Sequence, residues 1–106
     1  PSTVSIKGAV ILPSNVLFVP GRDLRYYTDR SGGYTQDADQ REVLVIRATG
    51  TIIKGRPSTR IELGDTIFVP TKVMVARLNE SKSTFEEIFN TVLNTGLFIA
   101  IIRSLT

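Results

Sequence analysis

The sequence predicts a two-layer α+β domain, in which one helix covers a mixed β-sheet, followed by a C-terminal amphipathic helix. Three observations support this prediction. Short apolar runs separated by Gly, Pro and Asn surround a single helical segment within residues 3–72. A chain of 106 residues has room for one domain with a small core. Apolar side chains then recur at helical spacing from residue 85 to the end.

The first elements form a β-hairpin. Residues 3–10 alternate between apolar and polar side chains, which predicts a strand with one buried face. Residues 13–15 make a turn, and the short apolar run 16–19 follows as a second strand. Pro20 and Gly21 are the residue types that a type II turn favours at its two central positions.

Residues 22–31 form the single helix of the domain. Gly32 and Gly33 follow it directly, and glycine at this place indicates a left-handed C-cap. Leu24 and Tyr27 lie three residues apart, so both are expected to face the sheet.

The remaining strands complete the sheet. Residues 34–41 are polar and form a loop, whereas residues 43–46 are four consecutive apolar residues and form a buried central strand. Residues 50–55 contain a turn and a short strand. Residues 61–70 hold a tight turn at Gly64 and Asp65 and then the closing strand, which Pro70 terminates. The order strand, strand, helix, strand, small strand, strand predicts the β-grasp (ubiquitin-like) arrangement.

After the domain, residues 73–83 form a linker, although the apolar residues within 73–78 could instead continue a strand or start a helix. Residues 84–106 form the C-terminal helix, for which Ser83 or Thr84 supplies the N-cap. Polar side chains occupy one side of the first half of this helix, among them Asn90, Thr91 and Asn94. The apolar side is made by Phe85, Ile88, Phe89, Val92, Leu93, Leu97, Ile99 and Ile102.

Composition argues against an enzyme. The chain has no Cys and no His, which removes disulfides, thiolate nucleophiles, most zinc sites and the usual general base. We therefore expect no catalytic residues, no cofactor and no metal. The net charge of +3 occurs without a dense Lys/Arg run or interleaved aromatics, so nucleic-acid binding is not predicted. A mildly basic surface fits an acidic polysaccharide or an anionic lipid equally well.

The candidate ligand-binding residues are basic or aromatic. Lys54, Arg56 and Arg60 lie in or beside a loop with Pro and Ser, and Arg25 lies on the predicted helix. Guanidinium groups bind carboxylates through paired hydrogen bonds, and Tyr34 offers a ring that stacks on a sugar. The alternative is that these side chains form an ordinary solvated surface.

Four segments in order resemble a known family: VSIKGAVILPSNVLFVPG, DLRYYTDRSGG, EVLVIRATG and IELGDTIFVP. Over residues 3–72 the chain is similar to the soluble-ligand-binding β-grasp (SLBB) domain of bacterial polysaccharide export proteins. The resemblance implies a periplasmic, ring-forming homo-oligomer that guides capsule or exopolysaccharide to the outer membrane, with an inner-membrane export partner. The N-terminal export signature of that family is missing, and Ser31 stands where Ala is commoner.

The resemblance also implies a role for the C-terminal helix, because some members form an α-helical barrel across the outer membrane. Only residues 97–102 are apolar all round, far short of the ~20 residues of a lone span. A ring of amphipathic helices would instead turn apolar faces to lipid and polar faces to a wet lumen. The alternative is a soluble helix that packs on its own domain or on a second copy. The chain begins Pro-Ser-Thr without Met, so we expect a piece of a longer secreted precursor.

Overall fold

The computed structural model describes residues 2–80 of the chain, and the predicted C-terminal helix over residues 84–106 lies outside the described residues. The chain divides into two compact units, Pro1–Thr71 and Lys72–Thr106. The first unit is an α+β domain with a five-stranded mixed sheet. In the second unit the described part is one short helix, α2 (Lys72–Glu80).

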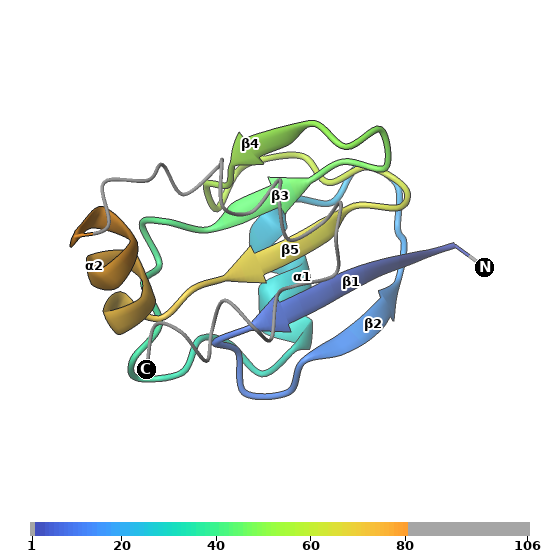
Figure 1. Cartoon of the computed structure of the whole chain (residues 1–106). Helices are drawn as coiled ribbons and strands as arrows, with labels where there is room; N and C mark the ends of the chain where they lie inside the picture. Colours follow the sequence, from blue (N-terminus) through green and yellow to red (C-terminus); the bar gives the residue numbers. More distant parts are fainter. Residues whose placement is uncertain (1, 81–106) are drawn as a thin grey trace. The chain divides into compact units, whose positions relative to one another are not determined.

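The sheet has the strand order β2-β1-β5-β3-β4 (Figure 1). Its strands are β1 (Thr3–Gly8), β2 (Ser14–Leu17), β3 (Leu44–Ile46), β4 (Ile52–Lys54) and β5 (Thr66–Val69). The two strands farthest apart in sequence, β1 and β5, pair in parallel, and the other three pairs are antiparallel. The predicted α+β class is therefore confirmed.

Helix α1 (Leu24–Arg30) begins later than the predicted residue 22 because Asp23 caps it. The Asp23 carboxylate accepts a hydrogen bond from the Tyr26 N–H at 3.1 Å, which satisfies one of the donors left free in the first turn. The predicted glycine cap is confirmed at the other end. Gly32 and Gly33 both have positive φ, and the Gly33 N–H donates to the Thr28 carbonyl at 2.9 Å, as in a Schellman motif.

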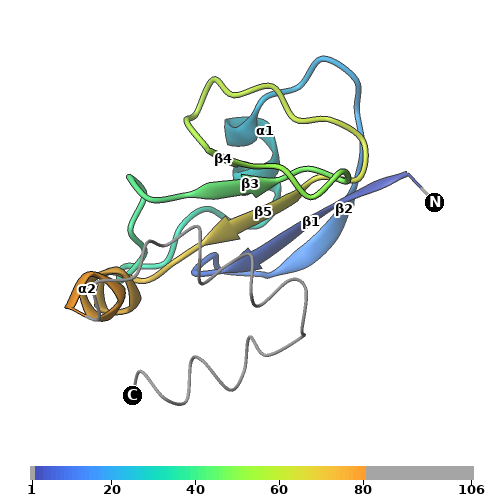
Figure 2. The same ribbon diagram turned by 45° about the horizontal axis from the view of Figure 1, so that its top comes forward.

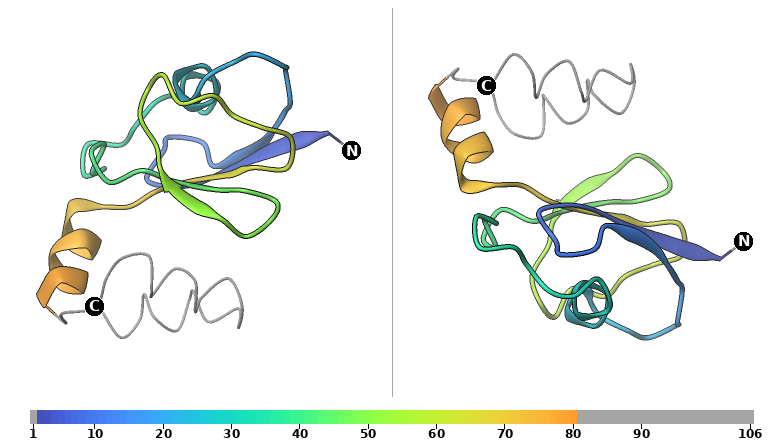
Figure 3. Two further views of the ribbon diagram at one scale, coloured as in Figure 1. Left: turned by 90° about the horizontal axis from the view of Figure 1, so that it is seen from above. Right: turned by 90° about the horizontal axis from the view of Figure 1, so that it is seen from below.

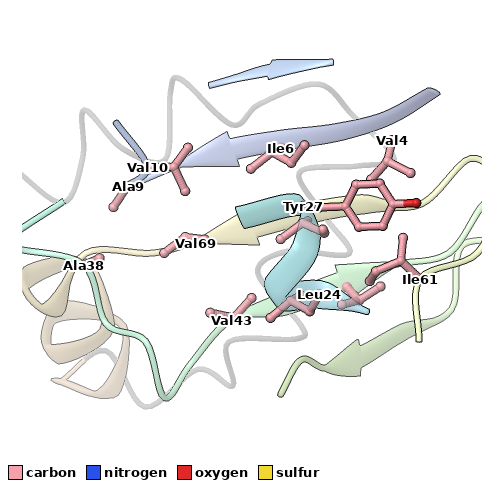
Figure 4. Close-up of a cluster of buried hydrophobic side chains, with 12 residues drawn as sticks. Val4, Ile6, Ala9, Val10, Leu24, Tyr27, Ala38, Val43, Ile61 and Val69 are labelled. Carbon is pink, nitrogen blue, oxygen red and sulfur yellow. The ribbon is translucent and has the colours of Figure 1, made fainter. Parts of the chain in front are cut away.

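One face of the sheet is covered by α1, which lies across the strands (Figure 2). Leu24 and Tyr27 project from the helix toward the strands, as predicted, and both are fully buried (Figure 4). The Tyr27 hydroxyl donates to the Val19 carbonyl at 3.1 Å and accepts from the Val19 N–H at 2.9 Å, so this core ring also holds the chain between β2 and α1. The core under α1 contains Val4, Ile6, Ala9, Val10, Leu24, Tyr27, Ala38, Val43, Val45, Ile61, Ile67 and Val69.

The buried central strand is also confirmed, since all four residues from Val43 to Ile46 are buried. The closing strand is confirmed as well: it covers Thr66–Val69, after the turn predicted at Gly64 and Asp65 and before Pro70. A turn precedes it, closed by a hydrogen bond from the Asp65 N–H to the Glu62 carbonyl at 3.2 Å, with Gly64 at positive φ. The turn keeps Ile61 in the core without making it part of the ladder.

Part of the segment expected as a linker is helical, since α2 covers Lys72–Glu80. These nine residues include no Gly and no Pro, and Met74, Ala76 and Leu78 are good helix formers, so local propensity supports the helix. Within residues 2–80, no helix combines the length and the apolar content that crossing a membrane requires.

Candidate functional site

A loop between β4 and β5 lies along the N-terminal half of α1 (Figure 3). Three backbone hydrogen bonds join them: Leu24 N–H to the Thr59 carbonyl (2.8 Å), Arg25 N–H to the Pro57 carbonyl (3.1 Å) and Ile61 N–H to the Arg22 carbonyl (3.1 Å). These bonds fix the loop backbone relative to the backbone of the helix, so the side chains of the two segments have fixed positions of origin relative to one another.

The loop itself is a tight turn. The Arg56 N–H donates to the Thr59 hydroxyl at 2.8 Å, and the Thr59 N–H donates back to the Arg56 carbonyl at 2.9 Å. Gly55 lets the chain pass close to the core, since a Cβ there would lie 3.1–3.2 Å from side-chain atoms of Val45, Leu24 and Val43. The turn therefore presents Arg56 and Arg60 outward while its base is anchored to the core.

The helix, the residue before its cap and the loop expose five arginines, which we together call the basic face: Arg22, Arg25, Arg30, Arg56 and Arg60. In the part of the chain that the structure describes, none of the five forms an ion pair with a carboxylate. The guanidinium carbons of Arg22 and Arg30 each lie 4.7 Å from the centroid of the Tyr26 ring, which is the geometry of a cation–π contact. Tyr26 thus holds two positive charges near one ring.

Three of the predicted ligand residues, Arg25, Arg56 and Arg60, belong to the basic face, on backbone segments that hydrogen bonds join. The prediction omitted Arg22 and Arg30, although their spacing of four residues on either side of Tyr26 already places all three on one side of a helix.

Lys54 does not belong to the basic face. Its ammonium group forms an ion pair with the Glu42 carboxylate at 2.6 Å, and this acid comes from the loop before β3. The pairing accounts for the charge of Lys54, so this side chain has less to offer an anionic ligand than an unpaired arginine.

Tyr34 is also separate from the basic face and has a structural environment. Its backbone forms an isolated antiparallel bridge with Val10, and its ring is half-buried against the core. Burial raises the pKa of the Tyr34 hydroxyl, a hydrogen bond with the Thr28 side chain lowers it, and the negative charge of Asp29 raises it further. The half-buried ring of Tyr34, beside the end of α1, therefore contributes to packing and is poorly placed to stack on a sugar.

A partly buried ion pair supports the loop that carries Arg60. The Arg47 guanidinium donates to Asp65 Oδ2 at 2.5 Å and to the Arg60 carbonyl at 3.3 Å. The same Asp65 oxygen accepts from the Glu62 N–H at 2.7 Å. Arg47 therefore connects β3, the turn before β5 and the part of the β4–β5 loop that carries Arg56 and Arg60, which we call the basic loop.

The chemistry available on the basic face is anion binding. Guanidinium groups present planar pairs of donors that match carboxylate and sulfate oxygens. The described residues include no group of His, Cys, Asp or Glu side chains able to hold a metal ion. A scan against protein-family models and a search of curated proteins both returned no match to this chain.

Proposed function

We propose that this chain is a non-catalytic SLBB-type β-grasp domain of a bacterial polysaccharide export protein. The observation that supports this most is the strand order β2-β1-β5-β3-β4, with parallel β1 and β5 at its centre and α1 on one face. The order agrees with a β-grasp topology. The four sequence segments that resemble the family contain β1 and β2, α1, β3 and β5 respectively.

In this proposal the domain contributes to a homo-oligomeric ring in the periplasm and to the wall of the glycan conduit. The basic face contacts the polysaccharide, which is acidic because five guanidinium groups, none of them ion-paired within residues 2–80, select anions. Residues 84–106 insert in the outer membrane as one member of a ring of helices, and an inner-membrane export partner supplies the polymer.

The polysaccharide contact predicts a salt-sensitive affinity that depends on the loop arginines. We expect Arg56→Ser with Arg60→Ser to weaken binding of a uronate-containing polysaccharide by about tenfold, because two charge-assisted contacts at a solvated surface are lost. The measurement is a titration at several salt concentrations. Arg41→Ser is the matched control, since Arg41 is exposed but lies in the loop before β3. Equal losses in both variants, or no loss in either, would contradict the proposal.

The membrane role of residues 84–106 is tested on the full chain by vesicle flotation. We expect the wild-type chain to float with vesicles, and the variant Leu93→Ser, Leu97→Ser, Ile99→Ser to stay at the bottom, because its apolar face is interrupted. The control variant Asn90→Ser, Thr91→Ser, Asn94→Ser changes only the polar side and is expected to float. Flotation of the apolar-face variant at the wild-type level would exclude insertion by this segment.

A further inference from the structure

Tyr26 of α1 holds two arginines of the basic face beside one ring. The guanidinium carbons of Arg22 and Arg30 each lie 4.7 Å from the centroid of this ring, so they are no more than twice that distance apart. The ring is itself held in place, because it packs against the core and meets the Tyr27 ring edge-on at a centroid distance of 5.0 Å. We call Arg22, Tyr26 and Arg30 the arginine–tyrosine triad.

The acids nearest to the triad in the sequence do not neutralise its two positive charges. The Asp23 carboxylate caps the helix, where it accepts a hydrogen bond from the Tyr26 N–H at 3.1 Å. Asp29 is exposed and directly precedes Arg30. Within residues 2–80 neither acid lies within ion-pair distance of Arg22 or Arg30. Both arginines are exposed, so their guanidinium donors face water and can accept an anionic partner.

Two like charges held beside one ring favour a ligand that brings two negative charges. The guanidinium groups repel each other, and a ligand that contacts both removes this repulsion while it gains charge-assisted hydrogen bonds. The cation–π contacts also order both side chains before the ligand arrives, which lowers the entropic cost of binding. A ring that already carries two guanidinium groups has less surface free to stack on a sugar or a base, so the contact depends on charge.

We propose that the arginine–tyrosine triad is a two-point subsite for the polysaccharide, at which Arg22 and Arg30 bind carboxylates on nearby sugar units and Tyr26 positions both arginines. The proposal rests on the proposed function and specifies the substrate as a polymer with closely spaced charges, carried by every sugar or every second sugar. Single charges separated by several uncharged sugars would engage one arginine at a time, and so would a monosaccharide with one carboxylate.

The test compares the binding of galacturonate, which has one carboxylate, with that of trigalacturonate, which has one on each sugar. The full chain carries Arg56→Ser and Arg60→Ser as a background, so that the basic loop does not contribute. In this background we expect the trimer to bind about tenfold more tightly than the monomer, whereas independent carboxylates would give only about threefold. The fully methyl-esterified trimer has the same sugars without charge and is expected not to bind.

Two variants at Tyr26 separate its positioning role from the charges of the arginines. Tyr26→Leu removes the ring, and we expect it to weaken trimer binding about fivefold and to leave monomer binding unchanged. Tyr26→Phe keeps the ring and is expected to bind like the parent chain. In NMR spectra the upfield ring-current shift of the Arg22 and Arg30 Nε–H signals should disappear in the leucine variant and persist in the phenylalanine variant. A circular-dichroism melt establishes that each variant is folded.

Two results would overturn the two-point subsite alone: a trimer no tighter than about threefold over the monomer, or a trimer affinity that Tyr26→Leu leaves unchanged. Binding of a uronate polysaccharide that depends on Arg56 and Arg60 would in that case still support the proposed function. Absence of any binding to the wild-type chain would instead contradict both proposals. An oligonucleotide that binds more tightly than the trimer at equal charge would identify a nucleic acid as the occupant and would also overturn the subsite.

Discussion

Replacing Gly8 with alanine is expected to lower the free energy of unfolding by about 4 kcal/mol or more, enough to unfold a marginally stable domain. Gly8 has φ +93°, a conformation that L side chains rarely adopt. An added Cβ would also lie only 2.1 Å from the Val69 carbonyl oxygen and 3.0 Å from the carbonyl carbon. Both are backbone atoms, so the clash is relieved only if β1 and β5 separate at the centre of the sheet.

Chemical denaturation of Gly8→Ala followed by circular dichroism measures this loss, with Gly21→Ala as the control. Gly21 has a similar φ of +85°, but an added Cβ there would have no neighbour within 4 Å. The control is therefore expected to lose only the conformational penalty of about 1–2 kcal/mol. If the two variants lost the same free energy, the close approach of Gly8 to Val69 would have no energetic role.

Gly8 illustrates what the sequence could not predict. In residues 3–10 it occupies an ordinary position of an alternating strand, and nothing within that segment requires glycine. The requirement comes from the pairing of Gly8 with Val69, a residue far along the chain. By contrast, the cap at Gly32 and Gly33 and the buried run from Val43 to Ile46 depend on neighbouring residues, and both were predicted correctly.

The same distinction applies to the basic face. The charges of Arg56 and Arg60 are visible in the sequence, but their position beside Arg25 depends on backbone hydrogen bonds between the loop and α1. The loss of Lys54 from the candidate site likewise depends on Glu42, which reaches it only through the pairing of β3 with β4. The sequence shows which residues carry a charge, whereas the fold determines which of these charges form ion pairs.

The basic face also depends on the buried carboxylate of Asp65, which lies outside that face. Asp65 is 1% exposed, and within the described residues its Oδ1 atom has no hydrogen-bond partner, so Arg47 and the Glu62 N–H balance its charge through Oδ2 alone. Arg47→Ala is expected to lower the free energy of unfolding by about 3 kcal/mol, because it leaves a buried carboxylate without its counter-charge. Chemical denaturation of the variant measures the loss.

A second substitution separates the free-energy cost of the unpaired Asp65 charge from the loss of packing around Arg47. Asp65→Asn in the Arg47→Ala background removes the charge and keeps an acceptor for the Glu62 N–H, so we expect it to recover about half of the lost free energy. Arg47→Ala also removes the donor to the Arg60 carbonyl, and this frees the end of the basic loop. Under native conditions the variant should therefore bind acidic polysaccharide more weakly than wild type, even though Arg47 is not on the basic face. A double variant no more stable than Arg47→Ala alone would mean that packing, and not the unpaired charge of Asp65, dominates at this position.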